Sequence, residues 1–203
     1  MATLDSNEKH DTHAPEAAGE FVSLRDHFLI AMPGLQDPIF SRSLTYICDH
    51  TAQGAMGIVV NQPMNLTLGD IFEQLELQDK AQQAGRAVLA GGPVNTERGF
   101  VLHRDSGAWE STMHIAPDVN LTASRDIVHA IANNTGPKSS LFALGYAGWS
   151  AGQLEEEISA NSWLTIPADS SIIFDIPVED RWAAAARQLG IDIHLMSATA
   201  GHA

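Results

Sequence analysis

Short apolar runs separated by turn residues dominate the pattern of hydrophobic and polar positions along this chain. His27 to Met32 forms the first run, while Leu44 to Asp49 and Met56 to Asn61 flank the polar Gln53-Gly54 pair. Two apolar runs joined by a polar turn that contains glycine predict a β-hairpin.

Further short runs predict more strands. They lie at residues 87–90, 99–103, 112–115 and 140–147. Glycine, proline and charged residues separate them, as expected of a meandering antiparallel sheet. The pattern does not favour a doubly wound parallel sheet.

Four segments have apolar residues at helical spacing, and they lie at residues 68–75, 127–131, 154–158 and 177–189. Thr67 and Asp70 predict a capping box before the first helix, and Ser150 and Gln153 predict one before the third. Together with the strands, these helices predict the α+β class.

The length and composition of the chain limit the number of domains that it can form. With 203 residues, of which 44% are hydrophobic and 18% charged, the chain is long enough to bury one continuous core. Residues 1–20 mix acidic and small residues without apolar periodicity, so we expect a flexible acidic N-terminal extension there. A single domain is expected over residues 21–203.

The charge and the cysteine content restrict the classes of molecule that the protein can bind and the compartment in which it is expected. The 25 Asp and Glu against 11 Lys and Arg give a formal net charge of −14, which disfavours direct binding to nucleic acid and to anionic membranes. The single cysteine, the missing signal-peptide pattern and the short apolar runs predict a cytoplasmic protein that does not enter the membrane.

Gly148-Trp149-Ser150-Ala151-Gly152 matches the G-x-S-x-G nucleophile elbow of serine hydrolases. Asp169, Asp175, Asp180 or Asp192 followed by His194 or His202 would complete the order of a catalytic triad. The same segment also fits a structural role, because Ser150 and Gln153 have capping spacing and the glycines permit a tight turn. We favour the structural interpretation.

Cys48 and His50 stand two positions apart on a predicted strand, so a regular strand would place both side chains on one face as a thiol–imidazole pair. A lone cysteine is more often a buried small hydrophobe than a nucleophile. His10 and His13 are a close pair without a fixed third ligand, so no metal site and no cofactor are expected.

Several separated motifs, taken together and in order, resemble the bacterial YqgE/AlgH family. They cover the chain from about Phe21 to its end and comprise Met32-Pro33, Asp37, Phe40, Cys48, His50, Gly54, Gly57, Asn61, Gly91-Gly92-Pro93-Val94, Gly148-Trp149 and Gly152-Gln153-Leu154-Glu155. The resemblance implies a single α+β domain in which a curved, largely antiparallel sheet or partial barrel is flanked by about four helices.

The resemblance brings no enzyme activity and no catalytic residues. Members are often labelled transcriptional regulators, but the charge of this chain disfavours direct operator binding. We therefore expect a noncatalytic cytosolic regulatory protein that binds a small molecule or a protein partner. The alternatives are a DNA-binding regulator and a hydrolase or thiol enzyme. The candidate ligand-lining or reactive residues are Cys48, His50, Asn61, Gly91, Gly92, Trp149, Ser150, Gln153 and Glu155.

Overall fold

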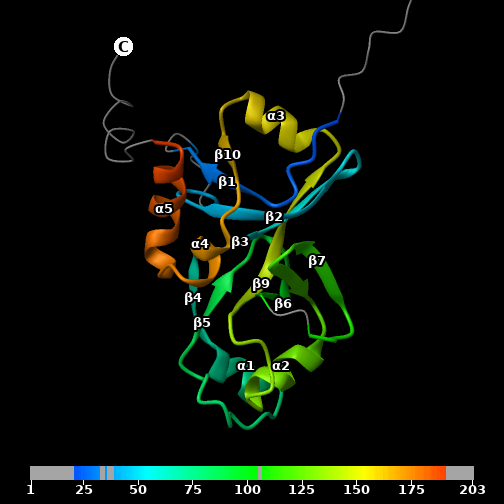
Figure 1. Ribbon diagram of the computed structural model, residues 1–203, viewed down its shortest axis with the longest axis vertical. Helices are drawn as coiled ribbons and strands as arrows, with labels where there is room; N and C mark the ends of the chain where they lie inside the picture. The colour runs from blue at the N-terminus through cyan, green and yellow to red at the C-terminus, as the bar shows by residue number, and fades with distance from the viewer. Residues whose placement is uncertain (1–20, 33–34, 36–38, 105–106, 191–203) are drawn as a thin grey trace, which may run out of the picture.

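The computed structural model describes residues 21–32, 35, 39–104 and 107–190 (Figure 1). In this part of the chain a ten-stranded sheet is accompanied by five α-helices and one 3-10 turn. The strands are β1 His27–Ala31, β2 Leu44–Thr51, β3 Gly54–Val59, β4 Pro63–Thr67, β5 Ala87–Ala90, β6 Val94–His103, β7 Thr112–Ala116, β8 Val119–Thr122, β9 Ser140–Ser150 and β10 Trp163–Pro167. The helices are α1 Leu68–Gln74, α2 Arg125–Ala132, α3 Gln153–Ser159, α4 Ser170–Phe174, the 3-10 turn η1 Val178–Asp180 and α5 Arg181–Gln188.

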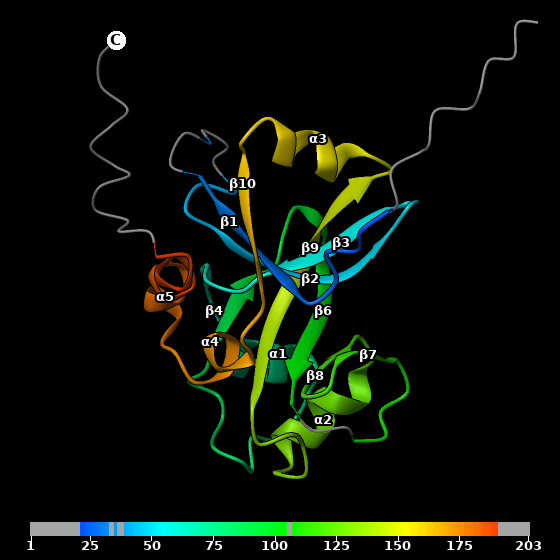
Figure 2. The same cartoon turned by 45° about the horizontal axis from the view of Figure 1, so that its top comes forward.

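The sheet follows the order β10-β1-β2-β3-β9-β6-β8-β7, with β5 paired to both β4 and β9. Every pairing is antiparallel except that of β5 with β9. The strands curl into a half-barrel, and this confirms the α+β class and the curved, largely antiparallel sheet (Figure 2).

β9 is the strand that joins the two parts of the sheet. Along one edge, residues 142–144 pair with β5 and residues 147–150 pair with β3. The other edge pairs with β6. The chain therefore has to cross β9 on its way from β5 to β6.

Glycines make this crossing possible. A Cβ atom on Gly91 would stand 2.3 Å from the Gly145 carbonyl oxygen, and one on Gly92 would stand 2.2 Å from the Tyr146 carbonyl carbon. Gly92 and Gly145 also have positive φ angles, +150° and +73°. Backbone here packs directly on backbone, which only residues without a side chain allow.

Alternating side chains divide the core into three clusters. Tyr46 and Cys48 point into the concave side of the half-barrel, and the intervening Ile47 points to the outer side, under α3. A third cluster beneath α1 and α2 contains Val101 and Phe142. The sheet thus carries apolar side chains on both faces and needs cover on both.

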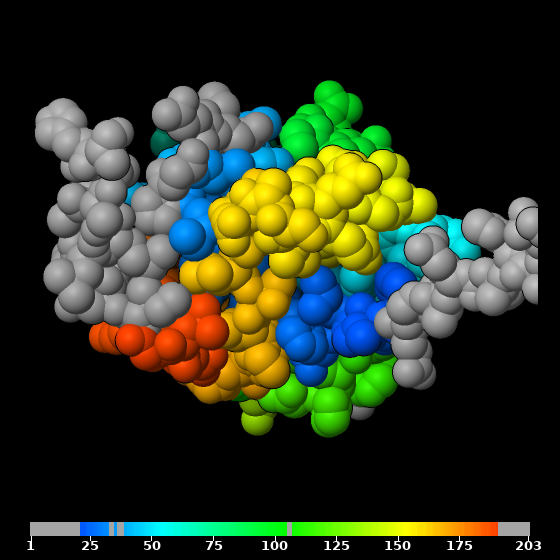
Figure 3. Space-filling model, turned by 90° about the horizontal axis from the view of Figure 1, so that it is seen from above, coloured from blue at the N-terminus to red at the C-terminus, as the bar shows by residue number. Residues whose placement is uncertain are grey.

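The helices supply that cover. α3 lies at one end of the molecule and α1 and α2 at the other, in both orientations (Figures 1 and 2). Viewed from above, α3 extends across the end of the sheet (Figure 3). α4 and α5 contribute Ile172, Ile173, Ala185 and Ala186 to the cluster inside the half-barrel.

Arg181, the first residue of α5, anchors this helix to the sheet. Its guanidinium donates to the Val60 carbonyl at 2.6 Å and to the Ile176 carbonyl at 3.0 Å. Burial lowers the pKa of Arg181 to about 10. The carbonyl acceptors compensate the desolvation of this cation, which has no carboxylate within 4.0 Å among the described residues.

The four predicted helices and the β2–β3 hairpin are present, and the capping box of Thr67 and Asp70 is confirmed on both of its hydrogen bonds. The third helix, however, does not follow β9 at once. β9 continues to Ser150, and Gly152, with φ +77°, is the N-cap residue of α3. The short elements β4, β8, β10 and α4 were not predicted.

Residues 1–20 lie outside the described part of the chain, as do His10 and His13. The flexible extension therefore stays a prediction.

Gly92→Ala should destabilise the protein by about 3 kcal/mol or more, because a methyl group cannot fit against the Tyr146–Ala147 peptide and the residue must keep a positive φ. Urea unfolding measures the loss. Gly85→Ala is the matched control, since nothing lies within 4 Å of its added Cβ. A Gly92→Ala loss no larger than that of Gly85→Ala would show that the crossing is not as tight as described.

Candidate functional site

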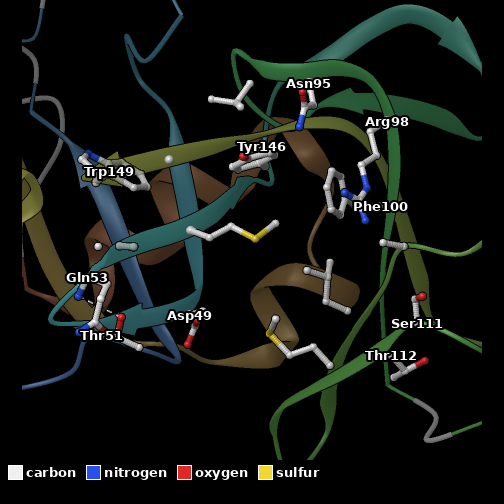
Figure 4. A pocket seen from close by; sticks show the side chains of 18 of the residues that line it. Asp49, Thr51, Gln53, Asn95, Arg98, Phe100, Ser111, Thr112, Tyr146 and Trp149 are labelled. Atoms are coloured by element: carbon white, nitrogen blue, oxygen red, sulfur yellow. Dashed lines mark hydrogen bonds between the residues drawn. The ribbon is translucent and has the colours of Figure 1, made fainter. Parts of the chain in front are cut away.

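An open groove of about 800 Å³ lies between the β2–β3 hairpin and the strands β6, β7 and β8. We call it the barrel groove. Figure 4 shows side chains from these separate segments converging on it. Its volume falls within the range of roughly 300–1,000 Å³ that small-molecule sites occupy.

The floor of the barrel groove is apolar and rich in aromatic and methionine side chains. Phe100 and Tyr146 pack edge to face, with ring centroids 5.8 Å apart. Met56 is half-buried on the hairpin side, and Met113 is 36% exposed on the β7 side. Methionine adapts its shape to a neighbour, so this floor can adjust to a bound molecule.

One wall of the groove is formed by an irregular stretch of β6. Val94 pairs with Tyr146 and Gly99 pairs with Leu144, so the intervening residues bulge out of the ladder. Asn95 has a φ of +49° in this bulge. Bulges redirect side chains and are common next to functional sites.

The bulge brings Arg98 to the groove. Its guanidinium carbon lies 5.3 Å from the centroid of the Phe100 ring, in a cation–π arrangement. Arg98 is exposed and forms no ion pair within the described part of the chain. It is therefore available to an anionic or hydrogen-bonding group.

Hydrogen-bonding side chains surround the apolar floor. Asp49, Thr51 and Gln53 lie on the hairpin side, while Asn95 and Arg98 lie across the groove from them (Figure 4). Glu110, Ser111 and Thr112 also line the groove, and polar groups placed around an apolar floor can orient a bound small molecule.

Arg25 closes the half-barrel beside the groove. Its side chain donates to the carbonyls of His114 and Ile115 on the edge strand β7, and its Nη1 lies 3.9 Å from Asp49 Oδ1 on β2. These bonds occupy part of the free edge of β7, where unpaired carbonyls would otherwise face solvent.

A regular strand would place Cys48 and His50 on one face, but β2 is not regular here. The register shifts between Ile47, opposite Gly57, and Asp49, opposite Met56, which marks a β-bulge. The extra residue reverses the alternation. Cys48 consequently lies in the core of the half-barrel, and His50 lies on the α3 side of the sheet.

Both side chains are held in structural roles. Cys48 is fully buried, and burial raises the pKa of its thiol, which keeps it protonated. His50 is 4% exposed, accepts the Leu24 N–H on Nδ1 at 2.8 Å and contacts Glu155 Oε1 through Nε2 at 2.9 Å.

Most of the other candidate residues meet at the junction of β9 and α3. Glu157 Oε2 accepts from the indole N–H groups of Trp149 at 2.9 Å and Trp163 at 2.8 Å. Gln153 Nε2 donates to Glu157 Oε1 at 2.9 Å. Glu157, which the sequence did not single out, is thus the centre of a network that fixes α3 to the sheet.

Ser150 does not sit on a nucleophile elbow. It is the last residue of β9, pairs with Gly54, and the turn comes after it. Its N–H and hydroxyl both donate to Gln153 Oε1, at 3.0 and 3.1 Å, and no described histidine is hydrogen-bonded to it. This contact replaces the predicted capping box, because Gln153 is the first residue of α3 rather than the third. His194 and His202 lie outside the described residues.

Asn61, Gly91 and Gly92 belong to the framework. Asn61 Oδ1 accepts the Leu44 N–H at 2.7 Å and its amide donates to the Arg42 carbonyl at 2.8 Å. Gly91 and Gly92 form the crossing over β9. Among the described residues, no group of three His, Cys, Asp or Glu side chains could hold a metal ion.

Only Trp149 among the nine candidate residues lines the barrel groove. The sequence does not single out Met56, Arg98, Phe100, Met113 and Tyr146 as groove residues. These residues come from four strands, and no local spacing signals that they meet.

The fold and the groove define a single-domain α+β protein with an open, apolar-floored groove on a curled sheet. A family model described as AlgH-like matches residues 28–194. The chain belongs to the AlgH-like family. No helix within the described ranges is long and apolar enough to cross a membrane.

Similar proteins and structures agree with this assignment. A UPF0301 protein of Saccharophagus degradans is 99% identical over 203 residues, which is all of both chains. One of Thioalkalivibrio sulfidiphilus is 56% identical over 88% of this chain and 96% of its own. The solution structure of the AlgH protein from Pseudomonas aeruginosa has a TM-score of 0.75 at 47% identity and covers 91% of this chain and 100% of that chain.

A crystal structure from Corynebacterium diphtheriae has a TM-score of 0.66 at 20% identity and covers 87% of this chain and 93% of its own. At this identity it supports the fold alone.

Glu157→Gln should cost about 2 kcal/mol of stability, because one amide oxygen replaces two carboxylate oxygens that accept three N–H donors. Urea unfolding followed by tryptophan fluorescence measures the loss. Glu156→Gln, on the exposed side of the same helix, is the control and should stay within about 0.5 kcal/mol of the parent. Equal effects of the two variants would mean that the network does not hold α3.

Proposed function

We propose that this protein is a noncatalytic regulatory protein that binds a small molecule with an aromatic or aliphatic body in the barrel groove. The observation that carries the proposal is the groove floor, where Met56, Met113 and Tyr146 leave apolar surface open beside the buried Phe100 in a cavity of about 800 Å³. Removing such surface from water stabilises a complex by about 25 cal/mol per Å² before the costs of association.

The surrounding groups would set the orientation of the ligand. Arg98 offers a cation that no described residue neutralises, and Asp49 offers a carboxylate on the other side of the groove (Figure 4). A molecule that carries an acceptor or anion at one end and a donor at the other matches this arrangement.

The noncatalytic part of the proposal is supported by the state of the two candidate nucleophiles. Cys48 is buried with a raised thiol pKa, and Ser150 donates its hydroxyl proton to an amide oxygen rather than to a base. Covalent catalysis needs a nucleophile within reach of a general base. The hydrolase and thiol-enzyme alternatives have correspondingly less support.

The other alternative is direct regulation by DNA binding. A formal charge of −14 opposes approach to a phosphate backbone, so a regulatory role through a bound small molecule has more support. A cytoplasmic location and a protein partner that senses the bound state stay predictions.

The methionines allow a site-resolved test. In full-length protein labelled with ¹³C at the methionine methyl groups, Met56 and Met113 report the barrel groove, and Met32 lies outside it. N-phenyl-1-naphthylamine, a neutral aromatic probe, should shift the Met56 and Met113 signals saturably and leave Met32 in place. The absence of a shift at Met56 and Met113, or equal shifts at Met32, would contradict the proposal.

A matched pair of variants tests the contribution of the floor. Met113→Ser should weaken binding of the probe about fivefold, since about 1 kcal/mol of apolar contact is lost. Leu189→Ser is the control, because Leu189 is also 36% exposed but does not line the groove. Unchanged affinity in Met113→Ser would place the probe elsewhere.

A further inference from the structure

A second cavity, of about 750 Å³, lies on the other face of the sheet, between α1, α2 and the β6 bulge. We call it the α1–α2 groove. Phe100 faces the barrel groove and the next residue, Val101, faces the α1–α2 groove. Successive strand residues point to opposite faces, so the sheet lies between the two cavities, which share the lining residues Arg98 and Ala123.

The floor of the α1–α2 groove is apolar and incompletely covered. Met64, Leu66, Leu75 and Leu144 are only half-buried there, although they pack against the buried cluster beneath the two helices. α1 has 7 residues and α2 has 8. Both helices are therefore too short to cover the apolar floor of the α1–α2 groove. An apolar chain laid into the groove would remove these side chains from water.

Two arginines stand at the rim of this floor. Arg98 from β6 and Arg125 from α2 are exposed, and neither has a carboxylate within 4.0 Å among the described residues. The chain has only 11 Lys and Arg against 25 acidic residues, and two of these cations lie together at this rim. Their position beside an apolar floor favours a ligand with a negative head and an apolar tail.

The acidic residues at the same rim restrict the charge of that head. Asp70 Oδ2 already accepts from the Thr67 N–H at 2.7 Å and the Thr67 hydroxyl at 2.8 Å, and these bonds lower its pKa. Glu97 is exposed. Asp70 and Glu97 place two carboxyl groups beside the two arginines, so a head with one negative charge meets less repulsion there than a multiply charged phosphate does.

We propose that the α1–α2 groove is a second ligand site, which shares Arg98 with the barrel groove and binds an alkyl monocarboxylate. Its chain lies over Met64, Leu66, Leu75 and Leu144, and Arg98 and Arg125 hold its carboxylate.

Dodecanoate is the probe, used below its micellar concentration with the ¹³C-methionine-labelled full-length protein. Met64 lines the α1–α2 groove, Met56 and Met113 line the barrel groove, and Met32 lines neither. Dodecanoate should shift Met64 saturably and leave Met32 in place. Acetate, which lacks the chain, should have no effect, and dodecyltrimethylammonium should bind at least tenfold more weakly.

The arginine variants complete the test. Arg125→Gln should weaken dodecanoate binding about tenfold, and Arg187→Gln, an exposed arginine on α5 outside both cavities, should leave it unchanged. The proposal is overturned if Met64 does not move, if Met32 moves with it, or if the cationic detergent binds as well as dodecanoate. Equal affinity of the parent and Arg125→Gln would also overturn it.

Discussion

The contact on which this structure depends is the crossing of one backbone over another at β9. Gly91 and Gly92 pass against Gly145 and Tyr146 at distances that exclude a Cβ atom. Because of this crossing, β5 can pair with one edge of β9 and β6 with the other. The sheet becomes continuous around β9 and curls, with apolar side chains on both of its faces.

The same crossing accounts for the position of the two grooves. Immediately after it, β6 cannot follow the ladder of β9, and the chain between Val94 and Gly99 bulges outward. Arg98 stands on this bulge and lines both cavities. A rigid strand beneath a bulge is a suitable support for binding, because the framework holds its shape while exposed side chains adapt. The glycine crossing therefore determines both the path of the sheet and the position of the proposed binding sites.

Local signals in the sequence predicted local structure well. The capping box of Thr67 and Asp70, the hairpin around Gln53-Gly54 and the apolar positions of α2 each depend on residues within a few positions of one another. The β2 bulge has no such signal, because Ile47 and Cys48 are both apolar and suit either face. For this reason the sequence could not show that Cys48 and His50 lie on opposite faces.

Features that depend on residues far apart in the sequence could not be predicted, because no local pattern signals them. Glu157 was one of three consecutive acidic residues on a predicted helix, and only the packing of α3 brings two indoles to it. The barrel groove needs β3, β6, β7 and β9 in register before its floor exists. The family motifs did locate the glycine crossing and the β9–α3 junction, which are the framework of the grooves rather than their linings.

We expect β9, which the glycine crossing locks and which lies beneath both grooves, to be the most stable part of the protein. Native-state amide hydrogen exchange tests it directly. We expect the amides of residues 142–147 that bond to neighbouring strands to exchange only through global unfolding, with a free energy equal to that from urea denaturation. Exchange of these amides through a smaller opening, while β1 or β2 stays protected, would contradict the account.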